Sequence, residues 1–587
     1  MPTDAGQRSE TRDPRDSLIK WREWSLEAFD EAAATNRLVL LDLSAEWCHW
    51  CHVMDQTTYS DPRVVSMIND NFVPIRVDID KRPDISDRYN RGGFPTTAFL
   101  SDRGESLWGS TYVPPQDMLN VMRAMLDAKE KGDVNAALEQ QRMQYLDISK
   151  ARDKLETVDA EFVDAIFEDI FAAYDSEWGG FGKEPKFPHP AAIDLLIERY
   201  SSSKDKELAG AVRSTLDHMT EGLYDEIEGG IFRYSVTRDW KVPHYEKMLE
   251  TNLGFLRNLA RARVVLGDEV FEDTADGVAK YVLDTLRDQD SRGFYSSQDA
   301  DEEYYKLDKK GRERRSRPKI IREVFSGLNC RAVSTLIETG ALLSRKDWTE
   351  AGMKAWSVTM RDHWDKGIGL VRHSAKTALY LFDDQVDFLE ALLSVAEVQS
   401  EAESERTLAL VAELNNGVGQ AFAHSEGGFG DVMRVPGAIG KLAEPERSII
   451  ANSRWARLIS LIGAATYNPA MKENAWKILG SFPPKQVQAN GIFASDYAYA
   501  WDALRLGPKS VEIHSLSGME PTSNELWISA KRSLNPSVVV LPAKKAMLEV
   551  DATQPFAVIC QDGGCSKEIF EPGELASRLR PTLPGQI

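Results

Sequence analysis

Cysteine is scarce in this sequence, and long apolar runs and an excess of basic residues are lacking altogether. Only five cysteines occur among 587 residues, whereas a secreted chain stapled by disulfides would carry more, so we expect a reducing, cytoplasmic location. Residues 1–17 have no apolar core for export, and no apolar run approaches the roughly twenty residues that cross a bilayer. The net charge of -21 argues against nucleic-acid binding, which needs clustered basic residues. We therefore expect neither a membrane nor a nucleic acid as partner.

A Cys-x-x-Cys pair, Cys48 and Cys51, follows a buried-strand pattern over residues 37–46 and is predicted to begin a helix. The order strand, Cys-x-x-Cys, helix is typical of thioredoxin-like redox sites. Backbone N–H groups at a helix N-terminus favour thiolate and lower the pKa of a thiol there. We predict Cys48 as the nucleophile, Cys51 as the resolving cysteine, and a disulfide-containing protein or a small thiol as substrate, with no cofactor.

Two further strand patterns, residues 71–80 and 93–100, agree with this domain type. In thioredoxin-like proteins the proline before the third strand is cis and faces the two cysteines, and Pro95 has that place. A cis X–Pro bond is infrequent enough to indicate a structural task. We predict that Pro95 presents backbone to a substrate thiol as the third residue of the catalytic site.

Three other interpretations of the cysteine pair remain open. The Cys-x-x-Cys-His pattern also attaches c-type haem, although that chemistry needs export, and no signal peptide precedes it. Two thiolates with His49 and His52 could bind zinc, but the strand and proline context favours redox chemistry. The pair could also be inert in a thioredoxin fold, because a fold does not by itself imply a function.

A short glycine-containing loop recurs every 50 to 75 residues between long amphipathic helices, which indicates a repeat architecture. Each interval has room for two helices, so we predict an (α/α)6 toroid of six helical hairpins with the loops at one rim. The residue after each glycine is expected to line the central cavity. A single loop could be a mere helix C-cap, but six in series are harder to dismiss. The loops are residues 179–182, 229–232, 292–295, 367–370, 427–430 and 490–493.

Acids, histidines and aromatic residues follow these loops and have the chemistry of a carbohydrate pocket. The candidates are His189, Arg233, Tyr234, Trp240, His244, Glu246, Asp299, Asp301 and Asp431. Asp299 and Asp301 could form a catalytic carboxylate pair, or His244 and Glu246 a proton-transfer pair. The alternative is that these groups satisfy one another and the buried loop backbone.

The predicted fold is multidomain, α/β plus all-α, as the length suggests. After residue 507, short strand patterns predict a small α/β unit, where Cys560 and Cys565 form a second thiol pair or half a metal site. The expected segments are a polar tail (1–17), a thioredoxin-like domain (18–125), a linker helix (126–157), the six-hairpin toroid (158–506) and the C-terminal unit (507–587).

Several motifs resemble the spermatogenesis-associated protein 20 family over almost the whole chain. They are Cys48 to Met54, Lys81 to Asp84, Pro185 to Pro188, Arg233 to Ser235, Val242 to Leu249, Gln298 to Asp301 and the Cys560/Cys565 pair. The resemblance implies a thioredoxin-like domain joined to a six-hairpin toroid like that of the N-acylglucosamine 2-epimerases. The resemblance is a better guide to the architecture of this chain than to its activity.

Three functions are compatible with this sequence. The first is a cytoplasmic thiol-disulfide oxidoreductase whose toroid binds a substrate or partner. The second is a sugar-active enzyme, an isomerase or hydrolase, whose toroid binds a sugar-like ligand beside a regulatory thioredoxin domain. The third is a non-enzymatic protein made of two binding modules.

Overall fold

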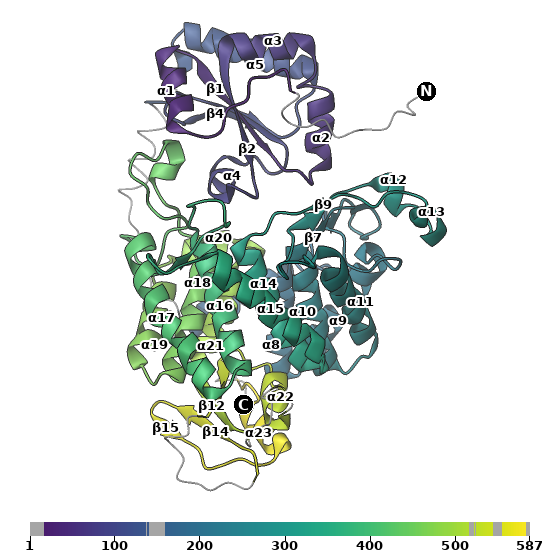
Figure 1. The fold of residues 1–587 in the computed structure, drawn as a ribbon, viewed down its shortest axis with the longest axis vertical. Coiled ribbons are helices and arrows are strands. Elements are labelled where there is room, and N and C mark those ends of the chain that lie inside the picture. Colours follow the sequence, from purple (N-terminus) through teal and green to yellow (C-terminus); the bar gives the residue numbers. More distant parts are fainter. Residues whose placement is uncertain are drawn as a thin grey trace. The chain divides into compact units, whose positions relative to one another are not determined.

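A computed structural model describes residues 17–134, 136, 138–139, 159–515, 522, 524–543 and 554–582. The chain forms two compact units (Figure 1). Unit 1 comprises Met1–Asp153 with Arg434–Pro445, and unit 2 comprises Lys154–Met433 with Glu446–Ile587. Nearly all of the predicted tail and most of the predicted linker helix lie outside the described residues.

Unit 1 contains a four-stranded sheet in the order β2-β1-β3-β4, in which only β1 and β2 are parallel. The strands are β1 (Leu38–Ser44), β2 (Phe72–Asp78), β3 (Thr96–Leu100) and β4 (Ser106–Ser110). The helices are α1 (Leu26–Ala34), α2 (His49–Gln56), α3 (Pro62–Asn71), α4 (Pro83–Tyr89) and α5 (Pro115–Glu130). This is the predicted thioredoxin-like fold.

The sheet of unit 1 is held by apolar packing against α3 and α5, which lie side by side (Figure 1). Ile68 and Met122 from these helices meet Leu40 and Phe72 in one core, and all four are fully buried. Each such side chain contributes about 1.5–3 kcal/mol through burial. The central strand β1 is buried on both faces, which explains its continuous apolar run.

Residues 434–445, which we predicted to be part of the toroid, pack with unit 1 instead. Arg88 of α4 is buried and donates from Nε to the Lys441 carbonyl at 2.9 Å, while the Lys441 N–H donates to the Tyr89 hydroxyl at 3.2 Å. A Cβ on Gly440 would lie 2.5 Å from that hydroxyl, so only glycine fits there. Local sequence patterns could not show a contact between positions so far apart in the chain.

Unit 2 contains the predicted (α/α)6 toroid. Between residues 159 and 505, all of them described, six inner helices close a ring in which each packs on the next and α21 returns to α8. The inner helices are α8 (Pro190–Ser203), α10 (Leu249–Leu266), α14 (Ser326–Leu343), α16 (Phe382–Val398), α18 (Ile449–Ala465) and α21 (Ser495–Arg505). The outer helices are α7 (Ala160–Ala172), α9 (Lys206–Leu223), α11 (Val270–Tyr281), α15 (Lys346–Asp362), α17 (Glu401–Phe422) and α19 (Pro469–Leu479).

Each glycine loop connects an outer helix to the next inner helix, so the loops gather at one rim, as predicted. The expectation that the residue after each glycine lines the central cavity is wrong for most loops, because Phe181, Ile231, Phe294 and Leu370 are buried in the hydrophobic core. The sixth loop instead forms a 3-10 turn, η4 (Gly491–Ala494).

A side-chain amide on the following inner helix binds the backbone of four of these loops. Asn252 accepts from the Ile231 N–H at 2.8 Å and donates to the Ile231 carbonyl at 3.2 Å. Asn329, Gln385 and Asn452 make the same pair of bonds in the next three loops. These buried amides satisfy loop backbone that has no helical or sheet partner.

Ion pairs join neighbouring inner helices of the ring. Arg331 of α14 and Arg454 of α18 both pair with Asp387 of α16, at 2.8 and 2.7 Å. Glu390, one turn further along α16, pairs with Arg454 at 2.6 Å and with Arg457 at 2.7 Å. The charges on α14, α16 and α18 are therefore mutually paired.

Shorter helices and strands lie in the connections at the rim of the toroid. They are β5 (Tyr234–Ser235), β6 (Pro243–His244), β7 (Lys247–Met248), η2 (Val282–Leu286), β8 (Ser297–Gln298), α12 (Glu302–Tyr305), α13 (Lys309–Glu313), β9 (Ile320–Ile321), β10 (Trp364–Asp365), β11 (Leu370–Val371) and α20 (Pro484–Ala489).

The C-terminal segment forms a second four-stranded sheet, in the order β13-β12-β14-β15, within the same compact unit as the toroid. Its elements are β12 (Lys509–His514), α22 (Glu525–Arg532), β13 (Val538–Pro542), β14 (Phe556–Gln561), β15 (Gly564–Cys565) and α23 (Pro572–Leu579). Cys560 and Cys565 are directly opposed on β14 and β15 and form a disulfide, so the second thiol pair is present.

Candidate functional site

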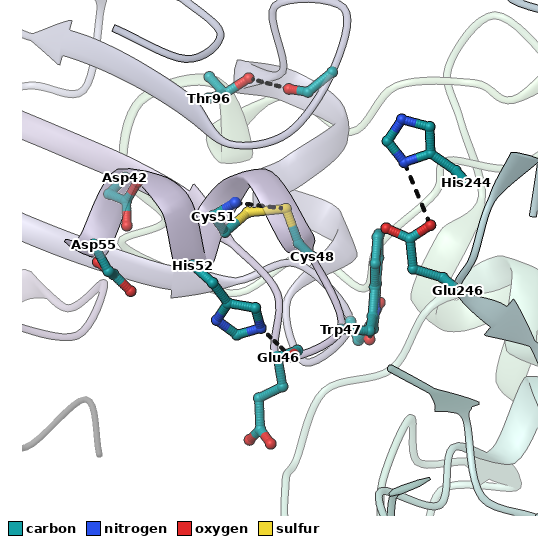
Figure 2. The surroundings of a disulfide bond; sticks show 12 residues. Asp42, Glu46, Trp47, Cys48, Cys51, His52, Asp55, Thr96, His244 and Glu246 are labelled. Carbon is teal, nitrogen blue, oxygen red and sulfur yellow. Dashed lines mark hydrogen bonds and ion pairs between the residues drawn. A yellow bond between two sulfur atoms is a disulfide. The ribbon is translucent and has the colours of Figure 1, made fainter. Parts of the chain in front are cut away.

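The cysteine pair lies where strand β1 gives way to helix α2. Cys48 is the N-cap residue of α2 and is joined to Cys51 by a disulfide (Figure 2). The Cys51 N–H donates to the Cys48 sulfur at 3.2 Å. A thiolate at Cys48 would receive the same bond together with the positive end of the helix dipole, which is the electrostatic setting predicted for a nucleophilic cysteine.

The segments next to the disulfide are fixed by specific hydrogen bonds. Trp47 donates from its indole N–H to Asp80 at 2.7 Å, and a ring nitrogen of His52 bonds the Glu46 carbonyl at 2.9 Å (Figure 2). The Phe94–Pro95 peptide bond is cis, as predicted. The catalytic role of Pro95 stays a prediction.

A buried carboxyl group, Asp42, is the titratable residue in the surroundings of the disulfide that our sequence interpretation missed (Figure 2). Burial raises the pKa of Asp42 to about 6, against the attraction of Arg76, whose Nε lies 2.7 Å from the Asp42 carboxylate. Arg76 is shared with Asp55 at 2.5 Å, and Tyr59 donates to Asp42 at 3.3 Å. An aspartate inside an otherwise apolar strand was the signal that could have identified it.

An aromatic surface accompanies the disulfide. Trp50, between the two cysteines, leaves 45% of its surface exposed and packs against Tyr112 with ring centroids 5.5 Å apart. The His49 ring meets Trp50 edge-on at 5.9 Å. An exposed tryptophan is a favourable contact for a partner chain, because it buries a large area with few rotatable bonds.

Several of the predicted toroid residues come together at the rim. Tyr234 stacks between Phe187 and His244, with centroid distances of 4.5 and 4.4 Å. Nδ1 of His244 lies 3.5 Å from the buried Glu246 carboxylate (Figure 2), and the role of the two as a proton-transfer pair stays a prediction. The Arg233 guanidinium lies 5.7 Å from the Tyr234 ring.

His189 belongs to the same part of the rim. Its ring is 6.3 Å from that of Phe187 and 5.7 Å from that of the exposed Phe493. Burial lowers the pKa of His189 to about 4, so the imidazole is neutral at pH 7 and can accept or donate a hydrogen bond.

The remaining toroid candidates have structural contacts. Trp240 is fully buried and donates to the Trp178 carbonyl at 2.9 Å, so it presents no open ring face. Asp301 is the N-cap of α12 and pairs with Arg315 at 3.2 Å, whereas Asp299 accepts from the Ala300 N–H. Asp431 accepts from the Glu446 N–H at 2.9 Å.

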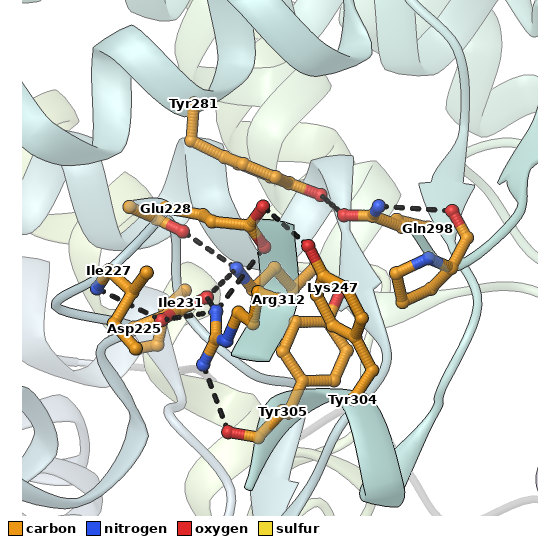
Figure 3. A network of polar contacts seen from close by, with 12 residues as sticks. Asp225, Ile227, Glu228, Ile231, Lys247, Tyr281, Gln298, Tyr304, Tyr305 and Arg312 are labelled. Atoms are coloured by element: carbon orange, nitrogen blue, oxygen red, sulfur yellow. Dashed lines mark hydrogen bonds and ion pairs between the residues drawn. The ribbon is translucent and has the colours of Figure 1, made fainter. Parts of the chain in front are cut away.

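Sequence reasoning also missed a buried lysine behind the rim. Lys247 has no exposed surface and donates to Asp225 at 2.6 Å and to the Gly229 carbonyl at 2.8 Å (Figure 3). Arg312 donates to the same carboxylate at 2.7 Å. Burial alone would raise the pKa of Asp225, but Lys247 and Arg312 hold it below its usual value.

The same arrangement occurs one repeat earlier. Asp175 accepts from the buried Lys186 and from Arg238, both at 2.7 Å. The signal available in the sequence was a Tyr-Asp pair just before each of the first two glycine loops, Tyr174-Asp175 and Tyr224-Asp225. In both repeats the aspartate and the lysine brace the loop.

Within the part of the chain that the structure describes, no group of three or more histidine, cysteine or acidic side chains is arranged to hold a metal ion. His49 and His52 do not join the cysteines in such a group. None of the described helices combines the length and the apolar character that a membrane span needs.

Comparison with known proteins gives matches to both parts of this architecture. The family model "Thioredox_DsbH: Protein of unknown function, DUF255" matches residues 10–153. Spermatogenesis-associated protein 20 of Rattus norvegicus is 30% identical over 308 residues, which are 48% of this chain and 39% of that protein. The chain thus spans well under half of the length of this relative, and the predicted resemblance to its family is confirmed over about half of the chain.

Shorter and more distant similarities accompany these. Thioredoxin-1 of Drosophila melanogaster is 35% identical over 68 residues, which are 12% of this chain and 61% of that protein. Among solved structures, a sugar epimerase from a ruminal bacterium matches with a TM-score of 0.45 and 10% identity, over 54% of this chain and 85% of that one.

Proposed function

We propose that this protein is a thiol-disulfide oxidoreductase with Cys48 as nucleophile and Cys51 as resolving cysteine. The observation that supports this most directly is the position of Cys48 at the N-cap of α2, with the Cys51 N–H directed at its sulfur. A protein disulfide or a small disulfide is the proposed substrate.

The reaction proceeds in two exchange steps. The Cys48 thiolate attacks one sulfur of the substrate disulfide, that bond breaks, and the first substrate thiolate leaves. Cys51 then attacks the Cys48 sulfur of the mixed disulfide and releases the second thiolate, so the substrate gains two electrons and the Cys48–Cys51 disulfide forms. An external dithiol returns the protein to its reduced form.

Asp42 is proposed to exchange a proton with the site during this cycle. Its carboxyl group is buried, and burial raises its pKa to about 6, so it changes charge near neutral pH. The exposed Trp50 is proposed to contact the substrate chain beside its disulfide.

The test is reduction of insulin disulfides with dithiothreitol as electron source. Cys48→Ser is expected to abolish catalysed reduction and Cys51→Ser to trap a mixed disulfide, while the double variant Cys560→Ser/Cys565→Ser, which removes the other disulfide, keeps full activity. Equilibration with glutathione should give a Cys48/Cys51 potential of roughly -270 to -200 mV. Unchanged activity in Cys48→Ser would overturn the proposal and leave a binding module as the better description.

A second candidate function is binding or conversion of a sugar at the rim of the toroid. The specific observation that favours it is the partly exposed ring of Phe187, which ends the stack of Phe187, Tyr234 and His244 near Glu246, because sugars stack on aromatic faces while acids and imidazoles bind their hydroxyls.

A panel of monosaccharides and disaccharides should raise the thermal midpoint of the parent but not of Phe187→Ala, with Tyr200→Ala on α8 as the control. A ligand at a hundred times its dissociation constant adds about 2.7 kcal/mol to stability, so binding of this kind is easily detected. If no saccharide raises the midpoint of the parent, this second function fails.

A further inference from the structure

Three cross-strand neighbours in the sheet of unit 1 form a polar row that helix α2 contacts. Asp42 on β1 is paired in register with Arg76 on β2 and with Thr97 on β3. Because residues opposite one another on neighbouring strands point to the same face of a sheet, the three side chains share one face. Asp55 reaches this row from α2, where it follows Cys51 by one turn of the helix (Figure 2).

Arg76 divides its hydrogen bonds unequally between two carboxylates. Its Nε donates to Asp42 at 2.7 Å, while Nη2 and Nη1 donate to Asp55 at 2.5 and 3.4 Å. The Arg76 guanidinium also lies over the Trp21 ring, 4.4 Å from its centroid, which fixes its position. Asp55 thus receives both Nη atoms, the two-point geometry that suits a carboxylate, and Asp42 receives a single bond.

The two carboxylates also differ in their access to solvent. The side chain of Asp42 is 1% exposed and that of Asp55 is 40% exposed. Solvent and Arg76 therefore both stabilise the charge on Asp55, whereas Asp42 depends on the protein groups around it. Burial is the largest cause of the raised pKa of Asp42, Arg76 acts against it, and the negative charge of Asp55 adds to it.

Charged and titratable groups face Asp42 from β2, from α2 and from the segment after α2. They are Arg76, Asp55 and Tyr59. Tyr59 donates to Asp42 at 3.3 Å and is hydrogen-bonded at 3.1 Å to the hydroxyl of Thr97 on β3, which does not titrate. Reduction of the disulfide adds two thiols at the start of α2 to these groups.

We propose that Asp55 is a positioning residue for proton exchange at the cysteine pair. By holding both Nη atoms of Arg76, it leaves Asp42 with one bond and thereby able to take up and release a proton. This inference rests on the proposed thiol exchange and names what controls it. In the second exchange step the Cys51 thiol gives its proton to the Asp42 carboxylate as its sulfur bonds to Cys48 and the second substrate thiolate leaves. The proton then passes from Asp42 to solvent.

The test follows the second exchange step of the full chain as a function of pH. Prereduced protein is mixed with oxidised glutathione, and the decay of the mixed disulfide on Cys48 is measured by acid trapping and mass spectrometry. The Cys48 sulfur does not titrate in this step, so the proton acceptor dominates the acidic side of the profile. The rate of the parent is expected to rise through the pKa of Asp42, about 6.

Asp55→Asn is expected to move this rise to lower pH by about one unit, because Arg76 then serves Asp42 alone and lowers its pKa. The rate above about pH 7 should fall, since a weaker base accepts the proton less readily. Asp55→Glu, which keeps the carboxylate, should restore the parent profile, and Asp30→Asn, at an exposed position on α1, should leave it unchanged. An unshifted profile in Asp55→Asn, or an equal shift in Asp55→Glu, would overturn the proposal.

An infrared titration of the oxidised full chain separates this proposal from the proposed function, because it needs no disulfide reduction. The band of the protonated Asp42 carboxyl group is the one that Asp42→Asn removes. This band is expected to disappear at lower pH in Asp55→Asn than in the parent. Disappearance at the same pH would overturn the role of Asp55 whether or not the parent reduces disulfides. A shift in a protein without reductase activity would count against the proposed function alone.

Discussion

Asp42 in unit 1 and Asp225 in unit 2 are both almost completely buried, and both face cations, yet their pKa values are shifted in opposite directions. Asp225 has two cations, Lys247 and Arg312, and its pKa is held below its usual value. Among the residues that the structure describes, the cation that pairs with Asp42 is Arg76, which it shares with Asp55, and burial raises the pKa of Asp42 to about 6.

Of these two buried aspartates, the one that faces two cations therefore keeps its charge, and the one that shares a single cation becomes titratable. With two cations, Asp225 stays ionised and braces a loop. Asp42 shares its single cation with Asp55 and changes charge near neutral pH, which suits a group near a cysteine pair proposed to be redox-active.

The largest loss of stability is expected when a cation that pairs with Asp225 is removed. Lys247→Met leaves the buried Asp225 carboxylate with one of its two cations, Arg312. We therefore expect the free energy of unfolding of unit 2 to fall by about 3–5 kcal/mol in urea titrations at pH 7.5. Lys280→Met, at an exposed pair with Asp284, should change it by less than about 0.5 kcal/mol. Equal, small losses in both variants would show that Lys247 does not stabilise the fold.

The second-largest expected effect is a gain in the free energy of unfolding, not a loss. Because the native state holds the Asp42 proton more tightly than the unfolded chain, stability is lost as pH rises from about 4 through 6. Asp42→Asn removes this cost, and a shift from 3.8 to about 6 corresponds to roughly 3 kcal/mol gained at pH 7.5, shrinking towards zero near pH 4.

Urea titrations of unit 1 at several pH values measure this difference, with Asp30→Asn, at an exposed position on α1, as the control. If Asp42→Asn is less stable than the parent at pH 7.5, the attraction of Arg76 outweighs burial and the comparison with Asp225 fails.

The smallest effect concerns the earlier repeat, where Asp175 has one buried and one partly exposed cation. Arg238→Gln removes the partner that keeps 37% of its side chain exposed, while Lys186 remains. Solvent screens the lost pair, so we expect the free energy of unfolding to fall by much less than in Lys247→Met, as measured by urea titration. A loss as large as that of Lys247→Met would mean that exposure of the cation does not matter here.

Much of the architecture was predictable because its signals are local. The apolar run before Cys48, the Cys-x-x-Cys spacing and Pro95 predict the thioredoxin-like domain, and the recurring glycine loops predict six helical hairpins. The interpretation of the loop aromatics failed because the loops are bound by amides such as Asn252, each the fourth residue of the following inner helix, and the sequence of a loop does not show this distant partner.

The candidate site was less predictable, since it depends on which side chains share a face. Tyr234 and His244 were both predicted as pocket residues and do stack on each other. Trp240 is also aromatic and lies between them in the sequence, but its side chain is buried in the core.

Sequence by itself determined the strands, the helix pairs and the position of Cys48 at a helix start, because periodicity and capping act over a few residues. Only the tertiary structure decided that Arg76 is shared between Asp42 and Asp55, that Asp225 receives two cations, and that residues 434–445 pack with unit 1. The reason is physical: burial and Coulomb interactions depend on distances between residues far apart in the chain, which no local pattern encodes.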